Sequence, residues 1–216
     1  MRRIPAFLLC TTIIACCATA HAQVQPAASQ QDAVAAPAPK IKYYNYANDE
    51  SEYSVMLPEA PTVQTIWEKS PETKTYLLGN LPDNTSFLGE IGTFSRTDID
   101  TEQTFEAQVI FLKAPQSFLQ SLTEDKIKGI LEQSYAGSTL INQKFRYSVG
   151  SGPNALKWAT LSGFLMDAHN QPTFVATHYL TGTQSIFVVK VQFSATNQLY
   201  NDYYNKLVGS ITYSPP

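Results

Sequence analysis

The side chains with the widest chemical range in this chain are two histidines, His169 and His178, which follow the first 22 residues. An imidazole can serve as a general base or as a zinc ligand near neutral pH. No H-x-x-x-H pair exists and no cysteine lies beyond residue 22, so we expect no zinc site. His178 alternates in phase with Phe174 and Leu180, which favours a structural histidine. As a base it would need an orienting carboxylate that the sequence does not reveal.

Two short stretches resemble known functional motifs but lack the residues that define those motifs. Asp98–Glu102 carries the alternating carboxylates of a calcium loop, but Gln103 stands where the loop needs its glycine and no suitably spaced Glu closes it. The run Ser148–Pro153 (SVGSGP) lacks both the G-x-S-x-G nucleophile elbow and the lysine of a phosphate-binding loop. We therefore expect a solvated acidic loop and a turn between strands.

All three cysteines lie in one apolar run at the start of the chain, behind Arg2 and Arg3. The run is too short to span a bilayer comfortably, and Ala20-His21-Ala22 is a signal-peptidase site. These features predict a signal peptide over residues 1–22. No disulfide is then available to the folded domain, which must depend on its apolar core.

A second processing route remains open. Ile13-Ile14-Ala15-Cys16 resembles a bacterial lipobox, which would shorten the signal to residues 1–15 and acylate Cys16. Both routes predict an exported protein of the bacterial periplasm or cell envelope. Membrane contact is expected only through a lipid on Cys16.

Residues 23–40 are rich in Ala, Pro and Gln, with a single acidic residue and no aromatic one. Such a segment cannot bury enough apolar surface to offset its chain entropy, which predicts a disordered linker. Residues 41–216 are long enough for one domain with a sizeable core. Without Arg2 and Arg3, 13 basic and 18 acidic side chains give a net charge of −5, which argues against nucleic acid as a partner.

Hydrophobic alternation predicts a mainly antiparallel β domain. The first half favours strands at 43–47, 53–57, 62–68, 73–81 and 85–96. In the second half, four strong strands separated by short turns lie at 140–149, 157–166, 173–180 and 185–194. Short connections require antiparallel pairing, since parallel strands need long crossovers.

Two amphipathic helices are expected to cover the apolar sheet. Residues 121–137 begin with Ser121 as N-cap and place Ile127, Ile130 and Leu131 on one face. A second helix within residues 196–210 aligns Leu199, Tyr200, Tyr203, Leu207 and Val208 along one stripe. Some helix is also expected within 105–119, although Pro115 interrupts it.

The chain holds 12 tyrosines, which fill interfaces between helices and sheets and also make good docking surfaces. Tyr200 and Tyr203 have the phase of core residues. Tyr204 lies beside that stripe and Tyr44 has no inward phase, so these two are the candidates for partner binding.

The stretch EYSVMLPEAPTVQT and the closing KLVGSITYSPP, together with the order of elements, resemble the PsbP-like α/β/α sandwich. This family takes its name from an extrinsic photosystem subunit and includes many small exported bacterial proteins. The resemblance implies an α+β fold with an antiparallel sheet flanked by helices. It also implies docking on larger assemblies rather than catalysis, and no functional residue of the family maps onto this chain.

The leading hypothesis is a non-catalytic exported envelope protein that binds an unknown protein or small ligand and needs no cofactor. It rests on the lack of a nucleophile–base set, a metal cluster or a cofactor loop. Two alternatives remain open, so catalysis is undecided. One is a hydrolase-type enzyme whose site assembles from distant residues around His178. The other is a small-molecule carrier with an apolar cavity beneath the sheet.

Overall fold

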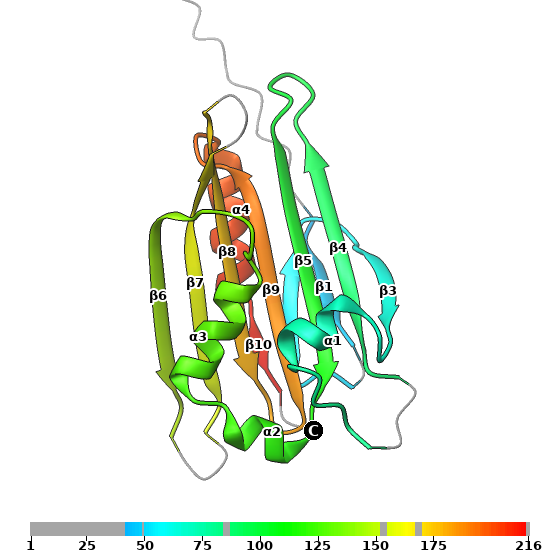
Figure 1. Ribbon diagram of the computed structural model, residues 1–216. Helices are drawn as coiled ribbons and strands as arrows, with labels where there is room; N and C mark the ends of the chain where they lie inside the picture. Colours follow the sequence, from blue (N-terminus) through cyan, green and yellow to red (C-terminus); the bar gives the residue numbers. More distant parts are fainter. Residues whose placement is uncertain (1–41, 49, 84–86, 152–154, 167–169, 215–216) are drawn as a thin grey trace, which may run out of the picture. The chain divides into compact units, whose positions relative to one another are not determined.

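The computed structural model describes residues 42–48, 50–83, 87–151, 155–166 and 170–214 (Figure 1). The chain divides into two units, residues 1–39 and 40–216, and all the described residues belong to the second. The expected signal peptide and the whole of the expected linker, with Cys16, lie outside the described residues, as does His169. The predicted boundaries 1–22, 23–40 and 41–216 stay predictions.

An antiparallel sheet of seven strands forms the centre of the described part, in the order β3-β4-β5-β9-β8-β7-β6. Short turns join most sequence neighbours, as the hydrophobic alternation predicts. The strands are β3 (Thr62–Ile66), β4 (Gly89–Thr97), β5 (Thr104–Lys113), β6 (Ile141–Val149), β7 (Lys157–Met166), β8 (Pro172–Thr181) and β9 (Ser185–Ser194). β6 and β3 are its two edges.

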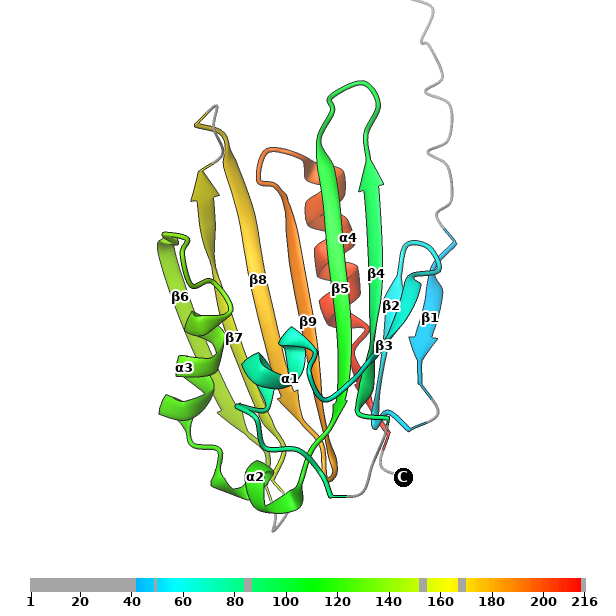
Figure 2. The same cartoon turned by 45° about the vertical axis from the view of Figure 1, so that its right-hand side comes forward.

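Four helices and a small second sheet cover the two faces of this central sheet (Figures 1 and 2). The helices are α1 (Pro71–Tyr76), α2 (Gln116–Ser121), α3 (Glu124–Gln133) and α4 (Gln198–Gly209). The small sheet has the order β1-β2-β10, from β1 (Tyr44–Ala47), β2 (Tyr53–Leu57) and β10 (Thr212–Tyr213).

Each face of the central sheet carries its own apolar core. On one face, α1, α2 and α3 pack on side chains such as Ile110, Leu161 and Val188. On the other face, α4 and the small sheet pack on side chains such as Phe105 and Val189. The predicted fold class is therefore confirmed: the chain is an α+β protein with an antiparallel sheet flanked by helices.

One segment expected as a strand, 73–81, is instead helix α1 followed by a turn. Pro71 occupies the start of the helix, where its missing N–H costs nothing. The Thr73 hydroxyl donates to the carbonyl of Ser70, at 2.6 Å, and fixes the first turn. Leu78 and Gly79 adopt positive φ angles of 52° and 77° and end the helix.

Two further expectations near helix ends were wrong, and a third was confirmed only in part. The helix expected within 105–119 begins only at Gln116, because residues 104–113 form the buried strand β5. Ser121 ends α2, and Thr123 is the N-cap of α3, accepting a hydrogen bond from the Lys126 amide. Leu199, expected in the core, is 42% exposed, since Tyr200 and Tyr203 of the same helix take the buried face.

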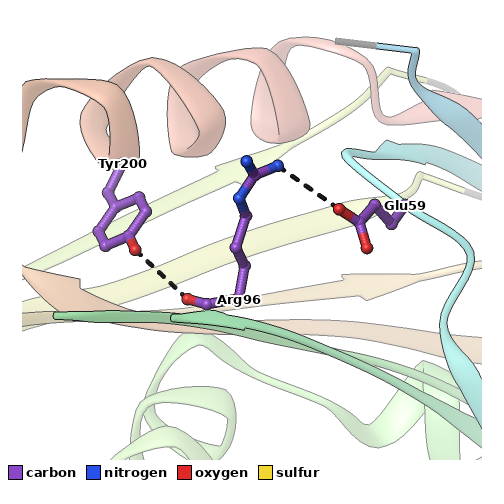
Figure 3. A network of polar contacts seen from close by, with 3 residues as sticks. All are labelled: Glu59, Arg96 and Tyr200. Carbon is purple, nitrogen blue, oxygen red and sulfur yellow. Dashed lines mark hydrogen bonds and ion pairs between the residues drawn. The ribbon is translucent and has the colours of Figure 1, made fainter. Parts of the chain in front are cut away.

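Helix α4 is fixed to the β4–β5 hairpin at its first turn (Figure 3). The Asn197 side chain caps the helix by accepting from the Tyr200 amide. The Tyr200 hydroxyl donates to the carbonyl of Gln103, at 2.9 Å, and lies 3.4 Å from the carbonyl of Arg96. The Arg96 guanidinium pairs with the Glu59 carboxylate at 3.4 Å. The Tyr200 hydroxyl thus ties the first turn of α4 to the β4–β5 hairpin.

The buried carboxylate of Glu52 ties β2 to the β8–β9 turn. It accepts hydrogen bonds from the amides of Thr183 and Gln184, from the hydroxyls of Thr183 and Ser185, and from Tyr213. Burial raises the pKa of Glu52, but the hydrogen bonds from Ser185 and Thr183 outweigh it and hold the pKa below its ordinary value. The small sheet is therefore held in place by a satisfied buried charge.

Candidate binding cleft

The face of the central sheet that α4 covers remains open over the edge strand β6 and its neighbour β7. A cleft of about 1000 Å³ lies there, between α4 and β6, and we name it the α4 cleft. The following side chains define it: Lys144, Arg146 and Ser148 of β6, Trp158, Thr160, Ser162 and Phe164 of β7, Phe174 and His178 of β8, and Tyr204, Asn205 and Val208 of α4.

Strand alternation sorts the side chains of β7 between the core and the cleft. Ala159 and Leu161 are fully buried in the core shared with α3. The even-numbered residues between and beside them point to the opposite face, where they form the floor of the α4 cleft. The pattern of β7 is thus that of a strand with one covered face and one open face.

The register across β6, β7 and β8 gives the cleft a polar centre between two aromatic ends. Arg146 lies opposite Thr160, which lies opposite His178, and Lys144 lies opposite Ser162 in the next row. At one end Trp158 pairs with Ser148. At the other end Phe164 pairs with Phe174, with ring centroids 5.7 Å apart.

His178 is 3% exposed, and both of its ring nitrogens are engaged. Nδ1 lies 3.3 Å from the indole nitrogen of Trp158 and 2.9 Å from the Thr160 hydroxyl. Nε2 lies 3.2 Å from the Tyr204 hydroxyl. The Tyr204 ring also packs on Phe174 and Phe193, with centroids 5.2 and 5.9 Å away.

The direction of these hydrogen bonds follows from the indole, which can only donate. Nδ1 of His178 must therefore accept from Trp158, so Nε2 carries the proton and donates to the Tyr204 oxygen. The Tyr204 hydroxyl keeps its own proton for an acceptor in the cleft. A chain of three buried or half-buried side chains thus aims one donor at the polar centre.

Burial lowers the pKa of His178 from its ordinary 6.5 to about 4. The ring is neutral at physiological pH, as the hydrogen-bond pattern requires. Burial also raises the pKa of Tyr204, and the nearby Arg146 guanidinium opposes that rise. Arg146 and the Tyr204 hydroxyl therefore act on the same part of the cleft.

Charge in the α4 cleft is of one sign. Lys144 and Arg146 are exposed and, within the described residues, neither forms an ion pair. None of the described lining residues is Asp or Glu. In a chain with a net charge of −3, this cleft is a local positive site.

His178 meets no orienting carboxylate in the described part of the chain: its polar neighbours are Trp158, Thr160 and Tyr204. The enzyme hypothesis required His178 or several carboxylates to converge in a pocket. The α4 cleft contains His178 at its buried floor, but no carboxylate among its described lining residues.

The two candidate partner-binding tyrosines lie in different places. Tyr204 faces the α4 cleft. Tyr44 is 47% exposed on β1, an edge of the small sheet, and does not line the cleft. Partner binding by either residue stays a prediction.

Asp98 uses its carboxylate to close its own turn by accepting from the amides of Asp100 and Thr101. Within the described residues, no group of three or more His, Cys, Asp or Glu side chains is placed to hold a metal ion. Among the same residues, no helix has the length and apolar character needed to cross a bilayer.

Sequence reasoning missed Lys144, Arg146 and Trp158 as site residues. The alternation in 140–149 does place Lys144 and Arg146 on one face of a strand, which is a usable signal. Their meeting with Tyr204, some sixty residues later in the chain, depends on the position of α4, which strand patterning does not contain.

No family model and no curated protein matches this chain. Among solved structures, the chain is similar to the cyanobacterial PsbP (CyanoP) of Synechocystis sp. PCC 6803, with 11% identity and a TM-score of 0.49 over 82% of this chain and 96% of that one. It is also similar to LpqN, described as involved in cell envelope biogenesis of Mycobacterium tuberculosis, with 13% identity and a TM-score of 0.35 over 81% and 91%. The first of these names is that of the family which the sequence resembles.

Proposed function

We propose that this protein is a non-catalytic binding module of the bacterial cell envelope, and that its partner occupies the α4 cleft. The observation that carries the proposal is the open face of β6 and β7. Cations, hydroxyls and aromatic rings gather there beside α4, whereas the central strands of the sheet carry a packed core on each face. Concave sites with a few convergent polar groups among apolar ones are typical of binding sites.

The chemistry of the cleft supports binding rather than catalysis. A histidine with a pKa of about 4 is a weak base, and both nitrogens of His178 are already hydrogen-bonded. The cleft offers donors and apolar surface, which recognise a partner without transforming it. The carrier alternative calls for an apolar cavity beneath the sheet, whereas the α4 cleft is open and mixed in polarity.

The location in the envelope rests on the leader sequence, and its test is mass spectrometry of the mature N-terminus. A chain that begins at unmodified Gln23 supports free export, and one that begins at an acylated Cys16 supports a lipoprotein tethered by residues 23–40. A chain that retains Met1 contradicts export by either route.

Blocking the α4 cleft tests the binding function. Ser162 lies half-buried on its floor, so Ser162→Trp fills the cleft without entering the core. Ser117→Trp adds the same side chain at an exposed position of α2 and serves as the matched control. We expect the immobilised wild-type domain and Ser117→Trp to retain the same component of envelope extracts, and Ser162→Trp to lose it. Equal retention by all three proteins would refute the cleft as the binding site.

A further inference from the structure

We propose that the α4 cleft binds an extended acidic segment of a partner protein. One carboxylate of the segment meets Lys144, Arg146 and Tyr204, and apolar residues on either side of it rest on the aromatic ends of the cleft. This inference rests on the proposed binding function and adds the chemistry of the partner.

The polar centre of the cleft presents charged or directed donors. Arg146 and Lys144 can only donate, and the Tyr204 hydroxyl is left with a free proton because its oxygen accepts from His178. Trp158 and Thr160 hold His178 in the tautomer that enforces this. These three donors have no charged acceptor in the cleft, so they favour a bound anion. A carboxylate can accept hydrogen bonds from all three.

The floor of the cleft favours an extended chain over a helix. A helix satisfies its own backbone groups, whereas an extended segment needs hydrogen-bond partners along its length. Ser148, Thr160 and Ser162 lie along the floor, and Asn205 lies on the α4 wall. Hydroxyls and amides both donate and accept, so they can serve the backbone of a segment that runs along the strands.

Neither a second copy of this chain nor its own linker suits the site. β6 is an edge strand, but antiparallel pairing of two β6 strands centred on Phe145 would set Lys144 against Arg146 of the other copy. The linker over 23–40 has one acidic residue and no aromatic one. The cations thus disfavour self-pairing and favour an acidic partner.

The strand rise sets the spacing of the partner's side chains. On β7, Thr160 marks the row that contains Arg146. Trp158 lies two residues before Thr160, and Phe164 lies four residues after it. At a rise of about 3.3 Å per residue, the aromatic ends lie about 7 Å and about 13 Å from the carboxylate position. An extended segment meets both ends with apolar residues two positions before and four positions after its acidic residue, or in the reverse order.

The test uses the blocked peptide acetyl-FAEAAAF-amide, its reversed sequence, and versions in which Gln or Lys replaces the Glu. Binding to the full mature chain is followed by amide and indole NMR signals. At millimolar concentration we expect a Glu peptide to shift the signals of Trp158, Thr160 and Ser162. The Gln version should bind about tenfold more weakly, because it loses the charge-assisted hydrogen bonds, and the Lys version should not bind.

Substitutions on the protein complete the test. We expect Arg146→Gln and Lys144→Gln each to weaken binding of the Glu peptide about tenfold, and Tyr204→Phe, which keeps the ring, to weaken it about fivefold. Lys69→Gln removes an exposed cation far along the chain from the cleft and should leave binding unchanged.

Equal binding of the Glu, Gln and Lys peptides overturns the inference, as does the absence of shifts at the cleft. If the peptides fail while Ser162→Trp still abolishes capture from envelope extracts, the acidic segment is wrong and the binding function stands. Capture of a lipid or glycan through the cleft would likewise refute the acidic segment and leave the binding function in place. If the peptides fail and Ser162→Trp has no effect, both proposals fall.

Discussion

Acidification should destabilise this protein through one residue, His178. The pKa of this buried imidazole lies at about 4 in the folded chain, against 6.5 for the ordinary group. The unfolded chain therefore binds a proton more readily than the folded one, so protonation favours unfolding. The contribution of the neutral His178 to the free energy of unfolding is fully present above pH 6.5. It decreases as the pH falls and is entirely lost below about pH 4.

The size of the effect follows from the pKa difference. One pKa unit corresponds to about 1.4 kcal/mol, so the full shift amounts to about 3 kcal/mol of unfolding free energy. At pH 5 the loss relative to pH 7 is about 2 kcal/mol. For a domain of this size that corresponds to a fall in Tm of about 4–8 °C.

The assay is urea unfolding of the mature chain at pH 7, 6 and 5. His178→Gln removes the titrating group, and its stability should be nearly independent of pH in this range, whatever its absolute value. His169→Gln removes the other histidine that lies outside the expected signal peptide, and it should retain the wild-type pH dependence. Glu52 contributes little between pH 5 and 7, because its ordinary pKa of 4.5 in the unfolded chain already lies below this range and its pKa in the folded chain is lower still. Equal slopes for wild type and His178→Gln would refute the neutral, buried histidine and the donor direction built on it.

Other predictions concern the contacts that frame the cleft. Glu52→Ala strands several buried donors and should cost about 3–5 kcal/mol in urea unfolding, whereas Glu59→Ala at an exposed ion pair should cost at most about 1 kcal/mol. Tyr200→Phe loses the hydrogen bond to the β4–β5 hairpin and should cost about 1 kcal/mol, and equal stability would contradict that anchor. Tyr203→Phe should be neutral or stabilising, since its buried hydroxyl has no partner among the described residues. Gly182→Ala would drive a methyl group into the Glu52 carboxylate and should lower stability by about 2 kcal/mol; wild-type stability would refute that close approach.

The meander could be predicted from the sequence because each of its strands has a clear alternation. In β9, for example, the apolar set Phe187, Val189, Val191 and Phe193 is buried on one face. Short turns then fix antiparallel neighbours. The pairing of β5 with β9, which joins the first half of the chain to the meander, could not be predicted, since alternation does not encode long-range partners.

Errors fell where local signals conflict. Thr73 and Thr75 give α1 the composition of a strand, and only Pro71 indicates a helix start. Ser121 has capping-box spacing, but Thr123 lies directly before the first helical turn and provides the cap of α3. In both cases a single residue at the start of the helix, Pro71 or Thr123, determined the structure against the pattern of its neighbours.

The candidate site was visible from the sequence only in part. Tyr204 was singled out because it lies beside the buried stripe of its helix, and His178 because of its chemistry. Their contact at 3.2 Å depends on the packing of α4 against the sheet, which strand and helix patterns do not encode. Lys144 and Arg146 become significant only once β6 is known to be an uncovered edge.

Photo-crosslinking in living cells tests the central claim most directly. A photoreactive amino acid is placed at the exposed Asn205 on the α4 wall of the cleft, and at Ser117 on α2 as the control. We predict a specific envelope adduct from position 205 that is absent from position 117 and is lost when Arg146 and Lys144 are both changed to Gln. Adducts of equal yield from both positions, or none from position 205, would contradict the account.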